Sequence, residues 1–154
     1  MHRPPLDELL LAVRAICRRT DAERDDVLQE ICDLLQGKVP HYDWVGFYYA
    51  ESVPRVLLLG PYAGAPTDHK QIPYGKGVCG QAAETEETIV VDDVTEEGNY
   101  LACSLDTQSE IVVPVMKDGA FVAELDLDSH TIGAFTAADR AFLEEVARLA
   151  AEWF

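Results

Sequence analysis

The stretch IVVPVMKDGAFVAELDL, residues 111–127, carries the strongest structural signal in the sequence. Two apolar runs, Ile111–Met116 and Phe121–Leu127, flank the turn Lys117–Gly119. An Asp-Gly pair between β-prone runs is typical of a tight hairpin, because both residues tolerate the positive φ angles that the turn requires. The stretch therefore predicts an antiparallel β-hairpin.

Acidic residues recur at every second position along the second strand of this hairpin. Because side chains alternate between the two faces of a strand, Glu124, Asp126 and Asp128 lie on one face. One interpretation is a solvated outer face, which antiparallel sheets commonly have. The alternative is functional, because the facing strand has no Lys or Arg and begins beside another acid, Glu110. Carboxylates that converge without a basic partner indicate a bound cation or a shared proton.

Helical patterns lie before and after the strands. Apolar residues at helical spacing predict helices over residues 6–19 and 21–36, the second capped by Thr20 or Asp21. The region between predicts strands at 44–50, 53–62 and 88–91, a short helix at 77–84, and loops at 60–77 and 92–109. A last helix is predicted from the cap Thr136 to about Trp153, with Asp139 completing an acidic capping box. This order of elements indicates the α+β class.

Length and charge bound the range of functions. The chain has 154 residues, which fits a single domain. We expect an N-terminal helical layer over residues 1–40, followed by the sheet, a pocket and the C-terminal helix over 41–154. Twelve Lys and Arg residues against 28 Asp and Glu residues give a net charge of −16. Such a field repels nucleic acid and anionic membranes and favours a cationic ligand.

The cysteines are those of a chain in a reducing compartment. We expect a cytoplasmic location, because the N-terminus shows no secretory signal and no segment approaches about 18 consecutive apolar residues. No Cys-x-x-Cys pair is present, so no metal site is predicted. Cys17 and Cys32 lie in helical patterns and are expected to be buried structural thiols. Cys79 and Cys103 lie beside glycine and in a predicted loop, respectively.

Five motifs together resemble one known family. They are DWVGFY at 43–48, IPYGKGVCG at 72–80, AC at 102–103, SEIVVP at 109–114 and LDLDS at 125–129. In order and spacing they are similar to the free methionine-(R)-sulfoxide reductases, small cytosolic enzymes built on a GAF domain. The resemblance runs from about Asp43 to the C-terminus. It implies a single GAF domain over 1–154, with a six-stranded antiparallel sheet, the terminal helices on one side and a loop-covered pocket on the other.

The resemblance also assigns roles to individual residues. Cys103 matches the family's catalytic cysteine. The substrate-binding positions that it implies are Glu110, Asp126, Asp128, a further acid at Asp92, and the aromatic pocket walls Trp44 and Tyr48. Taken without the family pattern, the two aromatic residues are ordinary core residues.

The implied reaction explains why acids and a thiol occur together. Carboxylates can hold the ammonium group of zwitterionic methionine sulfoxide, and a carboxyl crowded by others can protonate its oxygen. The Cys103 thiolate attacks the sulfoxide sulfur, and a sulfenic acid remains. A second thiol then forms a disulfide, which a thioredoxin-type reductant reduces. The resemblance implies no bound cofactor and a homodimer.

The sequence departs from the family at two places. The family typically has a resolving cysteine ten residues before Cys79, where this chain has His69. Cys79 can substitute for it, an external thiol can reduce Cys103 directly, or the activity is lost. The last possibility defines the alternative function: a non-catalytic GAF module that binds a small amino acid-like or cationic ligand. The second departure is Glu124, which replaces an apolar residue and either adds charge to the pocket or faces solvent.

Overall fold

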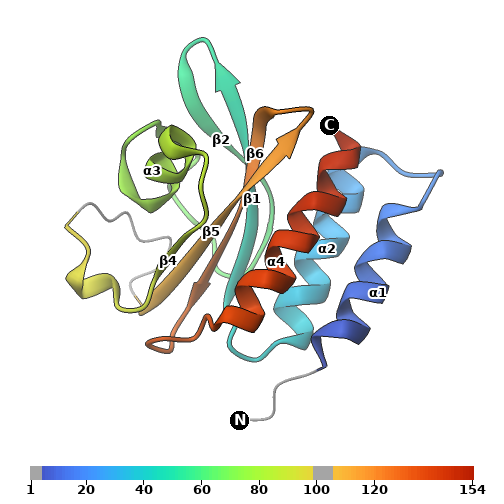
Figure 1. Cartoon of the computed structure of the whole chain (residues 1–154), viewed down its shortest axis with the longest axis horizontal. Coiled ribbons are helices and arrows are strands. Elements are labelled where there is room, and N and C mark those ends of the chain that lie inside the picture. The colour runs from blue at the N-terminus through green and yellow to red at the C-terminus, as the bar shows by residue number, and fades with distance from the viewer. Residues whose placement is uncertain (1–4, 99–105) are drawn as a thin grey trace.

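The computed structural model describes residues 5–98 and 106–154 of the chain. Figure 1 shows a central sheet with helices on both sides. The helices are α1 (Leu6–Cys17), α2 (Arg24–Lys38), α3 (Gly77–Thr85) and α4 (Ala137–Ala150). The strands are β1 (Trp44–Ser52), β2 (Arg55–Ala63), β3 (Gln71–Pro73), β4 (Ile89–Val91), β5 (Ser109–Lys117) and β6 (Ala120–Ser129). None of the described helices is both long enough and apolar enough to span a bilayer.

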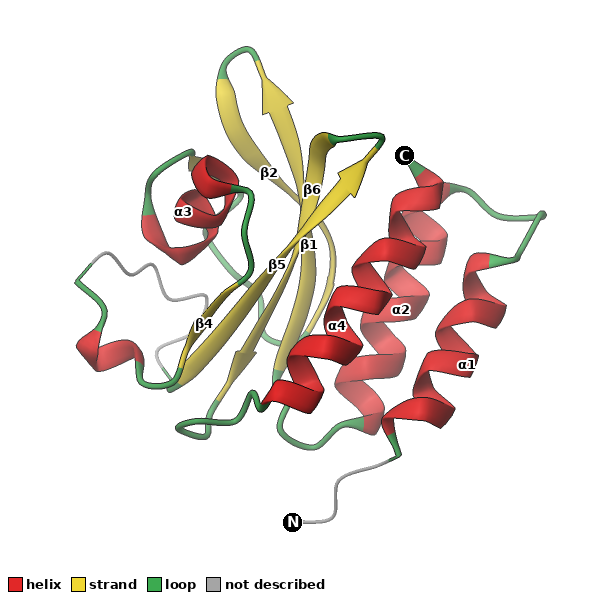
Figure 2. Cartoon of the chain, viewed as in Figure 1, coloured by secondary structure: helices red, strands yellow, loops and turns green. Residues whose placement is uncertain are grey.

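The sheet is antiparallel and has the strand order β3-β2-β1-β6-β5-β4. The predicted hairpin forms β5 and β6, of which β6 is a central strand, joined by a turn in which Asp118 and Gly119 both have positive φ. Helices α1, α2 and α4 cover one side of the sheet, and α3 lies on the other (Figure 2). The α+β class and the six antiparallel strands are therefore confirmed.

Two predicted boundaries are wrong. Helix α2 does not begin after Thr20 or Asp21, because Glu23 is its N-cap and forms a capping box with Asp26. The predicted loop at 60–77 contains strand β3, whose three residues pair with β2. A strand that short has too few residues to show a period of two.

Both faces of the sheet are buried, each against a separate core. On the helical side, Val45, Phe47 and Leu125 pack in a cluster that also contains Cys17 and Cys32, so the predicted burial of both thiols is confirmed. The cluster on the other side includes Trp44, Tyr48, Leu57, Cys79 and Val112. The acidic face of β6 belongs to this second side and is shielded from water, so the solvated-face interpretation is wrong.

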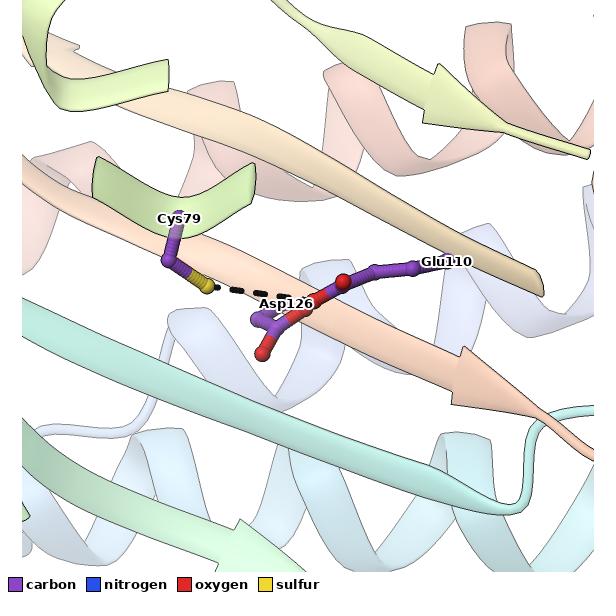
Figure 3. Close-up of side chains that lie close together, drawn as sticks. All are labelled: Cys79, Glu110 and Asp126. Carbon is purple, nitrogen blue, oxygen red and sulfur yellow. Dashed lines mark hydrogen bonds between the residues drawn. The ribbon is translucent and has the colours of Figure 1, made fainter. Parts of the chain in front are cut away.

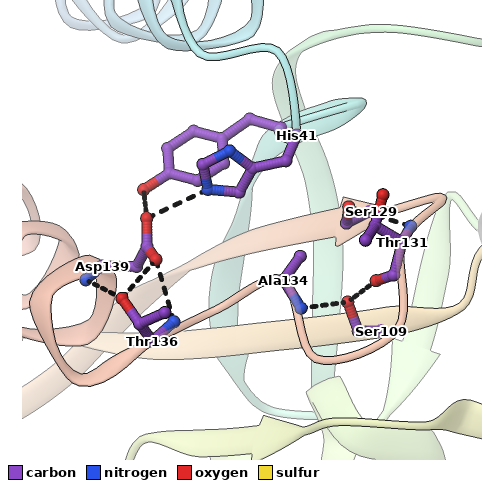
Figure 4. A network of polar contacts seen from close by, with 8 residues as sticks. His41, Ser109, Ser129, Thr131, Ala134, Thr136 and Asp139 are labelled. Carbon is purple, nitrogen blue, oxygen red and sulfur yellow. Dashed lines mark hydrogen bonds and ion pairs between the residues drawn. The ribbon is translucent and has the colours of Figure 1, made fainter. Parts of the chain in front are cut away.

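A buried polar network holds the start of β1 against helix α4 (Figure 4). The Asp139 carboxylate accepts hydrogen bonds from the Tyr42 hydroxyl at 2.7 Å and from the Thr136 backbone N–H at 2.8 Å. The ring Nε2 of His41 lies 3.2 Å from the same carboxylate. Burial opposes ionisation, but the hydrogen bonds from His41, Tyr42 and Thr136 outweigh it and lower the pKa of Asp139. The predicted capping box is confirmed. The same Asp139 carboxylate also links α4 to the residues before β1, and we call this set of contacts the Asp139 clamp.

We predict that Asp139→Asn lowers the free energy of unfolding by about 1–3 kcal/mol, because buried donors lose a charged acceptor. Since the folded-state pKa of Asp139 is depressed, its contribution is full above the pKa of an unfolded Asp, about 3.9, and is lost as the pH falls below it. Urea unfolding at pH 7 and at pH 3 measures both effects. Asp68→Asn, at an exposed loop position, serves as the control. Equal stability of Asp139→Asn and wild type at pH 7 would contradict the clamp.

Candidate active site

Strand pairing gathers the acids on one face of the sheet. Asp128 in β6 lies opposite Glu110 in β5, and Asp126 lies opposite Gly46 in β1. Glu124 continues the row, opposite Tyr48. The exposed fractions of the four acidic residues are 0 or 1%. Four carboxyl groups of one sheet face are therefore withdrawn from water together.

Helix α3 adds a thiol to this face. Cys79 lies in its first turn, and its Sγ donates a hydrogen bond to Glu110 Oε2 over 3.8 Å. One polar atom each from Cys79, Glu110 and Asp126 lies within 4.8 Å of the other two. Figure 3 shows these three side chains close together. The sequence left open whether Cys79 acts as the resolving thiol, and the structure places it in contact with Glu110.

The buried acids change one another's protonation. Burial raises the pKa of Glu110 well above its usual range, and the nearby Asp126 and Asp128 raise it further. Burial also raises the pKa of Glu124, with a second contribution from Asp126, while the Cys79 thiol offsets part of the change. Carboxyl groups in such surroundings hold protons near neutral pH, so the site can donate a proton.

Aromatic rings form one wall beside the acids. The Trp44 indole stacks on Tyr62 with ring centroids 5.3 Å apart, and its Nε1–H donates to the Ala65 carbonyl at 3.0 Å. A Cβ added to Gly46 would come within 2.3 Å of the Trp44 ring. Because Gly46 has no side chain, the Trp44 indole can lie against the backbone at this position. Gly46 is also the residue of β1 that pairs with Asp126.

Tyr48 forms the other part of this wall and fixes a loop. It is fully buried, and its hydroxyl donates to the backbone carbonyl of His69 at 2.9 Å. The residue that stands at the family's resolving-cysteine position is thus half-buried against the pocket wall, with its backbone held.

A hollow of about 490 Å³ opens beside the acidic face, and Asp128 is the member of the buried acidic row that lines it. Trp44 and Asp128 line it on the sheet side, and Asp106 and Thr107 line it where the described chain resumes. The remaining lining residues are Gln36, Asp43, Gly64, Ala65 and His130. The dimensions suit a small molecule, and the carboxylates suit one that carries a positive charge.

Two predicted site residues are not gathered into the buried cluster. Cys103 lies outside the described residues, although Asp106, three positions later, lines the hollow. Asp92 is exposed at the end of β4, where its backbone carbonyl accepts a hydrogen bond from Gly133. The roles assigned to these two residues stay predictions.

Sequence reasoning missed the part that Gly46 plays. The available signal was a glycine inside a strand rich in aromatic residues, because a glycine in a strand often marks a site where another group packs closely against the backbone. Sequence reasoning also left the direction of Glu124 undecided, and the structure places its side chain inside.

Comparison with known proteins identifies the family of the chain. A family model described as GAF domain matches residues 21–152, so the chain is a GAF domain protein. Protein YtsP of Bacillus subtilis is 33% identical over 138 residues, covering 86% of this chain and 84% of that protein. The free methionine-R-sulfoxide reductase of Saccharomyces cerevisiae is 41% identical over 109 residues, covering 70% of this chain and 60% of the yeast protein.

A solved structure matches over the whole chain. It is the X-ray structure of the free methionine-R-sulfoxide reductase of Neisseria meningitidis in complex with its substrate, with a TM-score of 0.90 and 32% identity. The match covers 100% of this chain and 94% of that one. The chain belongs to the free methionine-R-sulfoxide reductase family.

The buried acids predict an unusual dependence of stability on pH. Because the folded-state pKa values of Glu110 and Glu124 are raised, the folded protein keeps protons that the unfolded chain loses above about pH 4.3. Their contribution to stability is therefore present at low pH and is lost as the pH rises through the folded-state values. We expect the free energy of unfolding to fall between pH 5 and pH 8, and to fall less in the double variant Glu110→Gln/Glu124→Gln. A wild-type stability that rises over this range, or an equal slope in both proteins, would contradict the protonation described.

The fit between Gly46 and Trp44 predicts a local defect. Gly46→Ala drives a methyl group into the indole and is expected to cost about 1–3 kcal/mol of unfolding free energy. It also moves Trp44, which tryptophan fluorescence detects in a Trp153→Phe background. Gly37→Ala, at an α2 position with open space around it, is the matched control and should be neutral or slightly stabilising. An unchanged Trp44 emission in Gly46→Ala would show that the indole does not depend on the glycine.

Proposed function

We propose that the chain reduces free methionine-R-sulfoxide to methionine, with Cys103 as the attacking thiol. The observation that supports this most is the buried acidic face, whose Asp128 lines the hollow together with Trp44. A ligand with an ammonium group compensates the negative charge there through charge-assisted hydrogen bonds. The methyl and methylene groups of the same ligand suit the aromatic wall.

The protonation of the site suits a sulfoxide. A protonated Glu110 donates to the sulfoxide oxygen, while the Cys103 thiolate attacks the sulfur. The S–O bond of the substrate breaks, oxygen passes to Cys103 as sulfenic acid, and methionine leaves with its sulfur reduced by two electrons. In this proposal Asp128, which lines the hollow, holds the substrate ammonium group.

A second thiol completes the cycle. Cys79 is the candidate among the described residues, because it already lies at the acidic face. Its thiol condenses with the sulfenic acid, the sulfenic hydroxyl leaves as water, and a thioredoxin-type reductant opens the resulting disulfide. We place this cycle in the cytoplasm, in a homodimer, as the family resemblance predicts.

One departure favours a second function, a GAF module that binds the same kind of ligand without catalysis. His69 occupies the position where the family typically has its resolving cysteine. A binding module of this kind would keep its affinity in Cys103→Ser and show no turnover in the wild type.

A thioredoxin-coupled assay with separate R and S epimers tests the proposed reaction. We expect turnover of the R epimer alone, and a loss on the order of 10³-fold or more in Cys103→Ser, as when a nucleophile is removed. Cys17→Ser is the control, because Cys17 lies in the core on the helical side of the sheet and should leave the rate unchanged. Turnover of both epimers at one rate, or full activity in Cys103→Ser, would contradict the mechanism. The absence of turnover with every thiol reductant, together with saturable binding, would favour the binding module.

A further inference from the structure

Side chains from three separate elements meet on the buried acidic side of the sheet (Figure 3). They are Cys79 of α3, Glu110 of β5 and Asp126 of β6, and all three are buried. One sulfur or carboxylate oxygen atom from each lies within 4.8 Å of the other two. The three residues are far apart in the chain, so the absence of a Cys-x-x-Cys pair, from which the sequence predicts no metal site, does not bear on this cluster.

The spacing of these atoms matches the ligands of a zinc ion. Around a tetrahedral Zn²⁺, with sulfur at about 2.3 Å and a carboxylate oxygen at about 2.1 Å, the two ligand atoms are roughly 3.6 Å apart. Cys79 Sγ and Glu110 Oε2 are 3.8 Å apart. Since the Asp126 oxygen lies within 4.8 Å of both, all three atoms can reach one ion.

The surroundings of the cluster favour a cation. The second carboxylate oxygen of Glu110, Oε1, is buried and has no hydrogen-bond partner among the described residues. The two strands that carry the acids contain a single basic residue, Lys117, at the hairpin end of β5, whereas Glu110 lies at the opposite end. Cys79 lies in the first turn of α3, where the helix dipole favours an anion such as a thiolate. A divalent cation offsets charge that these strands leave uncompensated.

We propose that Cys79, Glu110 and Asp126 bind Zn²⁺, with water in the fourth position. The thiolate selects Zn²⁺ over Mg²⁺ and Ca²⁺, which prefer oxygen ligands alone. Metal ligands must be deprotonated, so the thiol proton and any carboxyl proton pass to solvent as the ion binds. The ion therefore occupies the proton donor and the second thiol of the proposed reduction, and Zn²⁺ and sulfoxide exclude each other. This inhibition rests on the proposed function, whereas the metal site itself does not.

Titration with Co²⁺ tests the site, in the full-length chain with Cys103→Ser. Co²⁺ occupies zinc sites and shows a charge-transfer absorption band when a thiolate binds it. We expect one Co²⁺ per chain with this band, displaced by Zn²⁺ but not by Mg²⁺. Cys79→Ser should abolish the band and lower the affinity on the order of 100-fold or more, because loss of a supporting group alone costs about 10–100-fold. Asp126→Asn and Glu110→Gln should weaken binding and keep the band. Cys17→Ser, on the helical side of the sheet, should match its parent.

Two results would overturn the proposal: no binding of Co²⁺, or a band and an affinity that are unchanged in Cys79→Ser. Because the titration requires no sulfoxide, its result stands even if the reductase activity is absent. The failure of the metal site and the failure of the proposed function are thus told apart. In an active wild-type protein, Zn²⁺ should inhibit in competition with the R epimer, and full activity of the zinc-loaded protein would also overturn the assignment of these ligands.

Discussion

Four carboxyl groups share one buried face of a β-sheet, and the rest of the site follows from that constraint. Carboxylates so close together cannot all be ionised away from water, so Glu110 and Glu124 are held toward their protonated forms. The constraint is set by strand pairing, because β6 carries acids at every second position and β5 places Glu110 opposite Asp128. A face of this kind lowers the stability of the empty protein at neutral pH and makes it receptive to a cationic ligand that can also accept a proton. Free methionine sulfoxide, with its ammonium group and its basic oxygen, has both properties.

The two sides of the sheet have different roles, one in stability and the other in the candidate site. The helical side supplies the large apolar core and the Asp139 clamp, which together provide stability without reference to a ligand. The opposite side carries the groups that burial penalises, and a thin cover of α3 and loops encloses them. Such a division explains how one small domain tolerates unsatisfied carboxyl oxygens, which few proteins keep in their interior. It also places the Cys79 thiol, two carboxyl groups with raised pKa values and two aromatic rings on one side of the sheet.

Much of the fold could be predicted from the sequence, because its central hairpin has both signals that strands require: alternation and an Asp-Gly turn. The class, the acidic row and the capping box of α4 followed in the same way. The three-residue strand β3 could not be found, because its pairing depends on β2 rather than on its own pattern. The burial of the acidic row could not be predicted either, because the alternation pattern assigns Asp126 to one face of the strand but does not show which elements cover that face. The approach of Cys79 to Glu110 depends on how α3 lies over the sheet, which no local pattern encodes. The family motifs supplied roles for these residues before their contacts were known.

In the proposed function, the buried acids hold the ammonium group of a free amino acid. Calorimetric titration of Cys103→Ser, which cannot turn over, with methionine-R-sulfoxide and with its N-acetyl derivative tests this most directly. Acetylation removes the positive charge and leaves the sulfoxide intact. We expect saturable binding of the free amino acid and a loss of affinity on the order of 100-fold or more for the acetylated one, because the buried charges then lose their partner. Equal affinity for the two ligands would show that the acidic face does not recognise the ammonium group and would contradict the proposed function.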